Sequence, residues 1–331
     1  IQCISFNQDF SCFALGTTSG FRVYGIEPSK IRERFKRKFN GGIGIIELLY
    51  KSNLVALVGG GKHPMFPTNK VIIWDDYQNK GIAELEYESD VYAVRLKRDI
   101  IVVVVESNIY VYDFRNLNLR HTFKTRGNTK GLIAISSGEK KIIAYPSENE
   151  ENVIIANLET GSEVTIEAHK HALSAMCLSP DANLLVTASS EGTLFRVWDT
   201  VKGEKIEEYR RGKSVAEIYS INFSQDGKFF VTSSNRGTIH VFSLANDGDI
   251  TNRSSKITKI VPGFSGTYGC CECSITPDIF TSTIFSWQNT TDKPVIMAIS
   301  VNGMLTKFTM EIDKEKGKAT LKEEESSQIF N

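Results

Sequence analysis

The hydrophobic positions of this chain recur in a repeated order that predicts β-strands along its whole length. In each unit an apolar strand leads through a turn to a second strand that ends in small residues. A glycine-containing turn then leads to an alternating strand that ends in an aromatic residue. The two clearest units occupy the ranges 173–199 and 218–242.

Seven such units can be recognised, because five weaker copies accompany the two clear ones. The terminal aromatic residues are spaced by 38 residues from Trp74 to Tyr112 and by 44 residues from Trp198 to Phe242. These intervals are typical of four-stranded propeller blades of the WD-repeat type. Since no convincing amphipathic helix separates the units, an alternating β/α fold is disfavoured. The pattern predicts an all-β fold, a single seven-bladed β-propeller of WD-repeat type over residues 1–331.

The last interval is longer than one blade, because 66 residues separate Phe242 from Phe308. The excess falls at residues 245–268, a segment rich in Asn, Asp, Ser, Gly and Lys. Long loops in compact domains are usually functional or disordered. We therefore predict an extended loop that leaves the sixth blade after its third strand.

The amino-acid composition limits the classes of protein to which this chain can belong. The chain has 331 residues, of which 41% are hydrophobic, so it can bury a sizeable core. Lys plus Arg and Asp plus Glu both number 39, which disfavours a nucleic-acid binder that works through a broad basic surface. The six cysteines show no disulfide framework, which fits a reducing compartment. No apolar run approaches the roughly 20 residues that span a bilayer. We expect a cytoplasmic protein without a cofactor.

The segment Tyr209-Arg210-Arg211-Gly212 lies at the boundary between the fifth and sixth units. Successive side chains of an extended segment point to opposite sides, so two guanidinium groups can enter two neighbouring pockets. Guanidinium matches phosphate in a two-pronged manner. Both flanking units supply small hydroxyls near a strand end, a Gly-Thr turn, and a cation or an imidazole. The combination predicts two anion sites side by side.

Simpler interpretations of these residues stay open. The hydroxyl groups can cap turns or bridge blades, and His240 can serve as an inter-blade hydrogen-bonding group. Cys270, Cys271 and Cys273 lack a second pair at zinc spacing, so we predict no metal site. No set of nucleophile, base and orienting residue stands out, so we predict no enzyme.

The sequence resembles the PROPPIN family, β-propellers that bind polyphosphoinositides. The family's hallmark is Phe/Leu-Arg-Arg-Gly between blades five and six, and Tyr209-Arg210-Arg211-Gly212 is an aromatic variant of it. The likeness extends over essentially the whole chain and includes Phe6-Asn7-Gln8-Asp9, Gly41-Gly42-Ile43-Gly44, Leu54-Val55-Ala56-Leu57-Val58-Gly59, Ala168-His169-Lys170 and Gly192-Thr193. The chain is more similar to the Hsv-type yeast branch than to the core autophagy member.

The resemblance implies two rim sites that read phosphatidylinositol 3-phosphate and phosphatidylinositol 3,5-bisphosphate. The first site would use His169, Ser189, Thr193, Arg196 and Arg210. The second would use Arg211, Ser233, Ser234, Thr238 and His240. The long loop resembles the family's membrane-inserting loop, with Phe264 and Tyr268 as membrane-inserting residues. A lone loop aromatic can also pack back onto its own domain.

The implied function is that of a monomer in solution that associates peripherally with endosomal, vacuolar and pre-autophagosomal membranes. It would act in autophagy, in selective microautophagy of the nucleus and in endosomal and vacuolar traffic, together with autophagy-related proteins. Thr68 follows Pro67 where members that recruit the large lipid-transfer partner have arginine, which argues against that partner. The alternative is a protein-only WD-repeat scaffold that binds acidic peptide motifs through its basic rim.

Overall fold

The computed structural model describes residues 1–27, 30–244, 267–276, 280–286, 293–313 and 318–330. Over these residues the chain consists of strands, turns and irregular segments without a helix. The strands form seven four-stranded antiparallel sheets, and each sheet follows the chain order of its strands. The predicted all-β fold with seven propeller blades is therefore confirmed. The chain divides into two compact units, Ile1–Ile133 and Ala134–Asn331.

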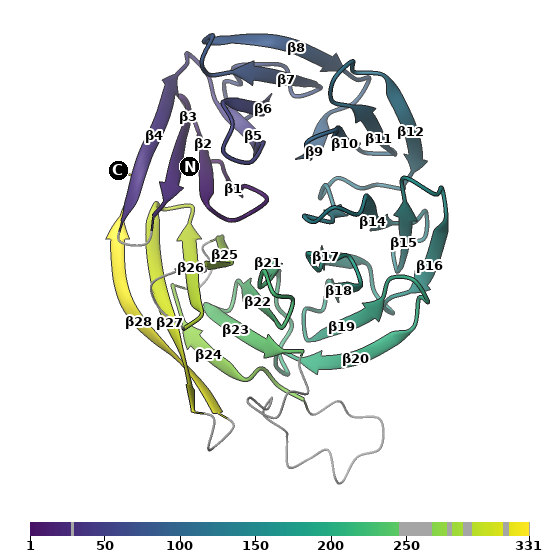
Figure 1. Ribbon diagram of the computed structural model, residues 1–331, viewed down its shortest axis with the longest axis vertical. Coiled ribbons are helices and arrows are strands. Elements are labelled where there is room, and N and C mark those ends of the chain that lie inside the picture. The colour runs from purple at the N-terminus through teal and green to yellow at the C-terminus, as the bar shows by residue number, and fades with distance from the viewer. Residues whose placement is uncertain (28–29, 245–266, 277–279, 287–292, 314–317, 331) are drawn as a thin grey trace. The chain divides into compact units, whose positions relative to one another are not determined.

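The first unit contains three sheets (Figure 1). They comprise β1 (Cys3–Phe6), β2 (Cys12–Thr17), β3 (Gly20–Ile26) and β4 (Ile31–Lys38); β5 (Ile43–Leu48), β6 (Leu54–Gly59), β7 (Lys70–Asp75) and β8 (Lys80–Glu86); and β9 (Val91–Leu96), β10 (Ile100–Val105), β11 (Asn108–Asp113) and β12 (Leu119–Lys124). The first strand of each sheet packs against its neighbour, β1 against β5 and β5 against β9.

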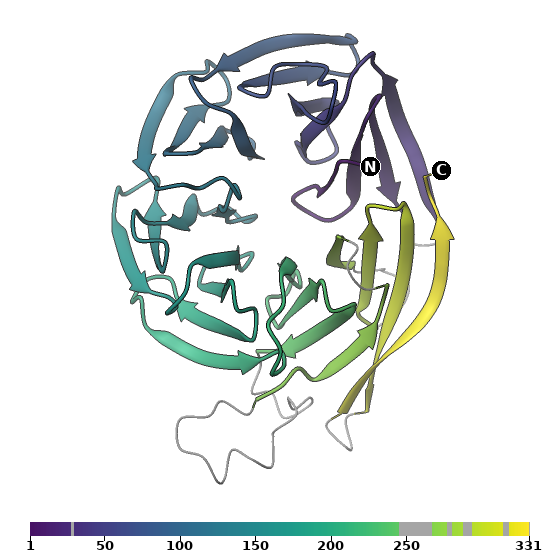
Figure 2. The same cartoon turned by 180° about the vertical axis from the view of Figure 1, so that it is seen from behind.

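The second unit contains four sheets, which the reverse view in Figure 2 also shows in chain order. They comprise β13 (Ala134–Ile135), β14 (Ile142–Pro146), β15 (Asn152–Asn157) and β16 (Glu163–Glu167); β17 (Leu173–Leu178), β18 (Leu184–Ser189), β19 (Leu194–Asp199) and β20 (Lys205–Arg210); β21 (Ile218–Phe223), β22 (Phe229–Ser234), β23 (Thr238–Ser243) and β24 (Cys271–Ser274); and β25 (Thr281–Ser286), β26 (Val295–Ser300), β27 (Met304–Asp313) and β28 (Lys318–Gln328). The sheets β17–β20, β21–β24 and β25–β28 are called the fifth, sixth and seventh sheets.

Burial explains which strands the sequence pattern detects. The second strand of a sheet is buried on both faces, and in β10 all six residues are both apolar and buried. The fourth strand is half exposed and alternates, as β8 and β12 show. Hydrophobic burial of the central strands thus stabilises each sheet.

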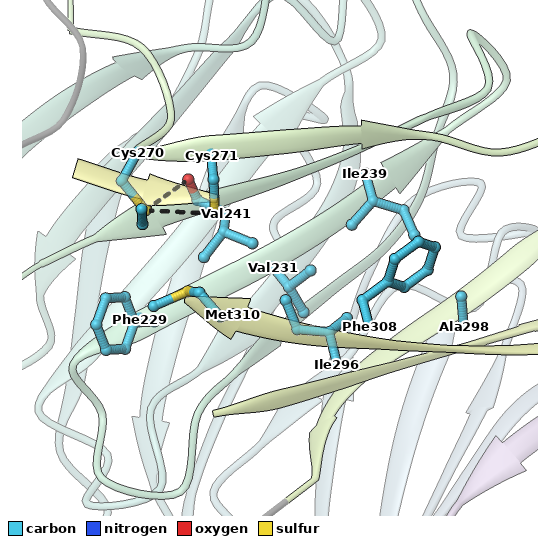
Figure 3. Packing of buried hydrophobic residues seen from close by; sticks show 11 residues of the cluster. Phe229, Val231, Ile239, Val241, Cys270, Cys271, Ile296, Ala298, Phe308 and Met310 are labelled. Atoms are coloured by element: carbon cyan, nitrogen blue, oxygen red, sulfur yellow. Dashed lines mark hydrogen bonds between the residues drawn. The ribbon is translucent and has the colours of Figure 1, made fainter. Parts of the chain in front are cut away.

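A hydrophobic cluster between the sixth and seventh sheets anchors β24 (Figure 3). Phe308 and Met310 from β27 lie in this cluster together with Val241 from β23. Cys270 and Cys271 are both 4% exposed, and the Cys270 thiol donates to the Val241 carbonyl at 3.4 Å. The two cysteines therefore act as apolar core residues at the start of the returning strand.

The predicted extended loop lies between β23 and β24, the third and fourth strands of the sixth sheet. Residues 245–266, including Phe264, lie outside the described residues. The loop boundaries 245–268, the insertion role of Phe264 and the single-domain assignment for 1–331 stay predictions.

Candidate functional site

The Arg-Arg segment is anchored by an aromatic residue at the end of β20. Tyr209 is 1% exposed and lies against Phe230 and Phe242, with ring centroids 5.7 and 5.5 Å away. Its hydroxyl donates to the Ser243 carbonyl at 3.1 Å. The tyrosine of this segment thus joins the fifth sheet to the sixth and fixes the backbone from which Arg210 and Arg211 project.

The two arginines have different surroundings. Arg210 is half-buried, and its backbone N–H donates to the Thr267 carbonyl at 2.7 Å. Arg211 is 7% exposed, and its Nε donates to the Gly192 carbonyl at 2.7 Å while a terminal nitrogen donates to the Ser214 carbonyl at 2.5 Å. Burial, and secondly the charge of Arg236, lower the pKa of the Arg211 guanidinium. A guanidinium nevertheless stays protonated in proteins, so Arg211 is a buried cation.

The turn between β18 and β19 brings the hydroxyls of Ser189 and Thr193 to the same sheet end as Arg210. Leu194 pairs in register with Arg210, and the Arg211 N–H donates to the Thr193 carbonyl at 2.9 Å. Gly192 has a φ of 58°, and a Cβ on it would lie 1.9 Å from the Ala216 carbonyl oxygen. Only glycine therefore allows the connecting chain to approach this turn so closely.

The turn between β22 and β23 repeats this arrangement on the sixth sheet. Ser234 and Thr238 flank the turn, and the Gly237 N–H donates to the Ser234 carbonyl at 3.2 Å. Arg236 occupies the exposed tip, where its Nε donates to the Val215 carbonyl at 2.9 Å. The sixth sheet thus places the half-buried Thr238 and an additional cation beside the Arg-Arg segment, whereas Ser234 is 2% exposed and its hydroxyl accepts from the Arg236 N–H at 3.4 Å.

The connector 211–217 ties the two turns together through backbone hydrogen bonds. The Ala216 N–H donates to the Glu191 carbonyl at 3.1 Å on the fifth sheet. The Asn235 N–H donates to the Glu217 carbonyl at 3.0 Å on the sixth sheet. One short segment therefore holds both turns and carries Arg211 between them.

Several predicted ligands already have partners inside the protein. Ser233 is fully buried, and its hydroxyl donates to the Thr281 carbonyl at 2.5 Å. The Arg196 guanidinium donates to Glu208 at 2.8 Å and to the Ala168 carbonyl at 2.7 Å. The Ser233 and Arg196 side chains therefore hold neighbouring strands and loops together through hydrogen bonds within the protein.

The His169 side chain is buried against β18 of the fifth sheet and is not exposed at the protein surface. It is 8% exposed, and its Nε2 lies 2.9 Å from the Thr187 hydroxyl, which also accepts from Trp198 Nε1 at 2.9 Å. Burial, and secondly the charge of Arg196, lower the pKa of His169 to about 4. At neutral pH the imidazole is therefore neutral and connects the loop before β17 to the core.

We expect acid to destabilise the protein through His169. The folded pKa of about 4 lies below the ordinary value of 6.5, so the unfolded chain binds a proton that the folded chain does not. Stability should fall by up to about 3 kcal/mol as pH is lowered from 6.5 to 4. Denaturant unfolding at both pH values measures the loss. In His169→Gln, which keeps an amide for Thr187 but does not titrate, the loss should shrink; an unchanged loss would contradict the assignment.

The sequence pattern assigned no role to three residues of this region, Arg236, Glu208 and Glu272. Arg236 precedes a Gly-Thr pair, as Glu191 does on the fifth sheet, and this parallel was available in the sequence. Glu208 and Glu272 lie on fourth strands, opposite Arg196 and His240 respectively. Pairing between strands depends on register, which the sequence alone does not supply.

Tyr268, the second predicted membrane-inserting residue, is half-buried and forms an isolated parallel bridge with Arg210. Its backbone therefore lies beside the Arg-Arg segment. Its role in insertion stays a prediction.

The comparison with protein families identifies the chain. A family model described as PROPPIN matches residues 1–278. The chain belongs to the PROPPIN family. The family was predicted from the Arg-Arg segment and is confirmed, whereas the narrower likeness to the Hsv-type branch stays a prediction.

Curated relatives of this PROPPIN are autophagy-related proteins. Autophagy-related protein 18e of Arabidopsis thaliana is 39% identical over 80% of this chain and 72% of the relative. Autophagy-related protein 18 of Dictyostelium discoideum is 37% identical over 77% of this chain and 68% of the relative. Autophagy-related protein 18 of Komagataella pastoris is 35% identical, and the match covers 75% of this chain but 52% of that protein.

Solved structures show the same fold. The structure of Kluyveromyces lactis Hsv2p has a TM-score of 0.80 and 22% identity, with 99% of this chain and 98% of that chain covered. A complex of KlAtg21 with the coiled coil of AgAtg16 has a TM-score of 0.79 and 21% identity, with 99% and 98% covered. At these identities the likeness concerns the fold alone.

Membership of the family establishes the general function of this PROPPIN. It is a phosphoinositide-binding propeller connected with autophagy, and the family consists of binding propellers rather than enzymes. Among the described residues, no helix is long and apolar enough to cross a membrane.

Proposed function

We propose that this PROPPIN is a peripheral membrane protein that recognises phosphatidylinositol 3-phosphate and phosphatidylinositol 3,5-bisphosphate through two sites on the fifth and sixth sheets. The observation that carries the proposal is the pair of Ser-to-Thr turns joined by the connector 211–217. Each turn brings hydroxyls and a guanidinium together, and these are the groups that bind phosphate oxygens.

The first site is formed by Ser189, Thr193 and Arg210, which are close to one turn of the fifth sheet. His169 and Arg196 support it from within, because both hydrogen-bond to neighbouring protein groups. The second site is formed by Ser234, Thr238 and Arg211, with Arg236 as an added cation and with Ser233 and His240 beneath. Tyr268 and Phe264 would bring the adjoining loop to the bilayer.

The proposed lipids also indicate the membranes at which the protein would act. We propose that the protein acts at endosomal, vacuolar and pre-autophagosomal membranes, in selective microautophagy of the nucleus and in endosomal and vacuolar traffic. Two moderate headgroup contacts on one rigid protein act bivalently, which allows avidity far above the affinity of each site. A loop that enters the bilayer adds the second kind of anchor that stable peripheral binding needs.

Flotation with vesicles of defined composition tests this function. We expect the protein to float with vesicles that contain phosphatidylinositol 3-phosphate or the 3,5-bisphosphate, and to remain behind with phosphatidylcholine alone. Vesicles with phosphatidylinositol 4-phosphate are the matched control, since they carry the same headgroup charge in a different position. Equal flotation with the 4-phosphate, or no flotation at all, contradicts the proposal.

A coiled-coil protein partner is the second candidate function. The solved complex of KlAtg21 with the coiled coil of AgAtg16 is the observation that favours it, since that propeller shares the fold of this chain. A scaffold would bind such a coiled coil in solution without lipid. Size-exclusion chromatography of the mixture, without vesicles, separates the two functions.

A further inference from the structure

The turns of the fifth and sixth sheets share one backbone arrangement but carry opposite charges at their tips. Residues 189–193 and 234–238 both read Ser-x-x-Gly-Thr, and in both turns the glycine N–H donates to the serine carbonyl. The two glycines have similar positive φ angles, 58° for Gly192 and 67° for Gly237. The residue before the glycine is Glu191 on the fifth sheet and Arg236 on the sixth. The two proposed sites therefore differ in the sign of the charge at one equivalent position.

The connector 211–217 holds the guanidinium of Arg236 close to that of Arg211. A terminal nitrogen of Arg211 donates to the Ser214 carbonyl at 2.5 Å, and Nε of Arg236 donates to the Val215 carbonyl at 2.9 Å. The two carbonyls belong to consecutive residues, so both cations are attached to the same short stretch of backbone. Burial, and secondly the charge of Arg236, lower the pKa of Arg211, which shows that the two charges repel each other.

The two arginines present their charge differently. Arg211 is 7% exposed and lies within the site, whereas Arg236 is exposed at the tip of its turn. The bond from Arg236 to the connector uses Nε, so the paired terminal nitrogens of this guanidinium remain for a ligand. Within the described parts of the chain, neither guanidinium has a recorded ion pair with a carboxylate. Two adjacent cations of this kind favour a ligand with more than one phosphate group.

The remaining charged groups of the second site add no net positive charge. On the connector, the exposed Lys213 and Glu217 have opposite signs. Beneath the turn, Nδ1 of His240 lies 3.1 Å from a carboxylate oxygen of Glu272. The positive charge of this site is therefore that of its two guanidinium groups.

Around the first site, positive and negative side chains offset one another. Glu191 at the tip is acidic, and Nε of Arg196 lies 2.8 Å from the Glu208 carboxylate. The loop before β17 carries the exposed Lys170, and the same loop is hydrogen-bonded to the backbone of the exposed Glu151. The first site thus lacks the cation that the sixth sheet places at its tip.

We propose that Arg236 makes the second site the preferred site for phosphatidylinositol 3,5-bisphosphate, whereas the first site, with Glu191 at its tip, prefers phosphatidylinositol 3-phosphate. The inference rests on the proposed function, because it distributes the two proposed lipids between the two proposed sites. A second phosphate adds a charge of about −1.5 to −2 at neutral pH. The Arg236 guanidinium can bind its oxygens with two N–H groups, whereas the Glu191 carboxylate repels it.

Each site is isolated by one replacement, since Arg210→Thr leaves the second site and Arg211→Thr leaves the first. Binding of both variants is measured with vesicles that contain either lipid, at the same pH and ionic strength. The ratio of the Kd for the monophosphate to the Kd for the bisphosphate should be about tenfold larger for Arg210→Thr. In that background, Arg236→Gln should weaken binding to the bisphosphate about tenfold and binding to the monophosphate less.

The reciprocal replacement should produce a gain. Glu191→Arg in the Arg211→Thr background places the missing cation on the fifth sheet, so the first site should bind the bisphosphate about tenfold more tightly. A gain of affinity cannot result from misfolding. The matched control is Arg115→Gln, which removes one charge from an exposed position in the first unit and measures the general attraction to the vesicle.

Competition by inositol 1,3,5-trisphosphate, the soluble headgroup, separates headgroup recognition from adsorption to the bilayer. It should reproduce the effect of Arg236→Gln. If the wild-type protein binds neither lipid, the proposed function fails. If both single-site variants bind but Arg236→Gln weakens both lipids equally, or no more than Arg115→Gln does, the role of Arg236 is wrong. An unchanged Kd ratio in Glu191→Arg would contradict the role of the tip position.

Discussion

Replacement of Arg210 and Arg211 together by threonine is expected to abolish binding to vesicles that contain phosphatidylinositol 3-phosphate. Either single replacement should weaken binding about 10²-fold, because bivalent attachment exceeds single-site attachment by about 10²–10⁴. The double replacement removes a guanidinium from each site, and no bivalent attachment remains. Vesicle co-sedimentation over a range of lipid concentrations measures all three variants.

Two controls make this result specific. Arg32→Thr/Arg115→Thr removes the same charge from exposed positions in the first unit and should leave binding nearly unchanged. Because Arg211 is buried and hydrogen-bonded, thermal melting must show that Arg211→Thr still folds. Full binding by the Arg210→Thr/Arg211→Thr variant, or an equal loss in the control, would refute the two-site scheme.

Replacement of Phe230 by alanine is expected to lower the free energy of unfolding by about 3–5 kcal/mol. Its ring is fully buried, stacks on Phe242 at 4.6 Å and meets Tyr209 at 5.7 Å. The loss of stability combines the hydrophobic transfer free energy of the deleted ring with the cost of the cavity that remains. Since Tyr209 precedes Arg210, lipid binding should weaken as well. Denaturant unfolding and vesicle binding measure the two effects.

Tyr77→Ala is the matched control for the aromatic change. Tyr77 is 90% exposed, so its loss should alter the free energy of unfolding by less than about 0.5 kcal/mol. Similar losses for the two variants would mean that the aromatic cluster under the Arg-Arg segment does not stabilise the sixth sheet.

The sequence revealed the buried strands better than the exposed ones. The residues of β10 form a continuous apolar run, and burial on both faces makes such strands conspicuous. The fourth strands escaped detection because their outer positions are charged, as in β4, where five of eight residues are basic. A strand that is half solvated carries little hydrophobic periodicity, and only sheet register reveals its place.

In the candidate site, too, local motifs could be predicted from the sequence, whereas contacts between distant residues could not. The Arg-Arg segment and the Gly-Thr turns are local and can be read from the chain. Glu272 lies 32 residues beyond His240, on the far side of the predicted loop, so no local pattern joins them. His169 was predicted as a ligand of the first site, and its contact with Thr187 depends on packing that a linear pattern does not contain.

The connector 211–217 affects how the protein would bind a second lipid headgroup once the first is bound. Its hydrogen bonds to both turns form when the protein folds, so the spacing between the proposed pockets is fixed before any lipid arrives. The conformational entropy of aligning the pockets is then lost during folding rather than during capture. In a protein that works as proposed, the lipids supply the remaining adjustment by diffusing laterally. The rate of second capture should therefore follow the fluidity of the bilayer and the surface density of the headgroup.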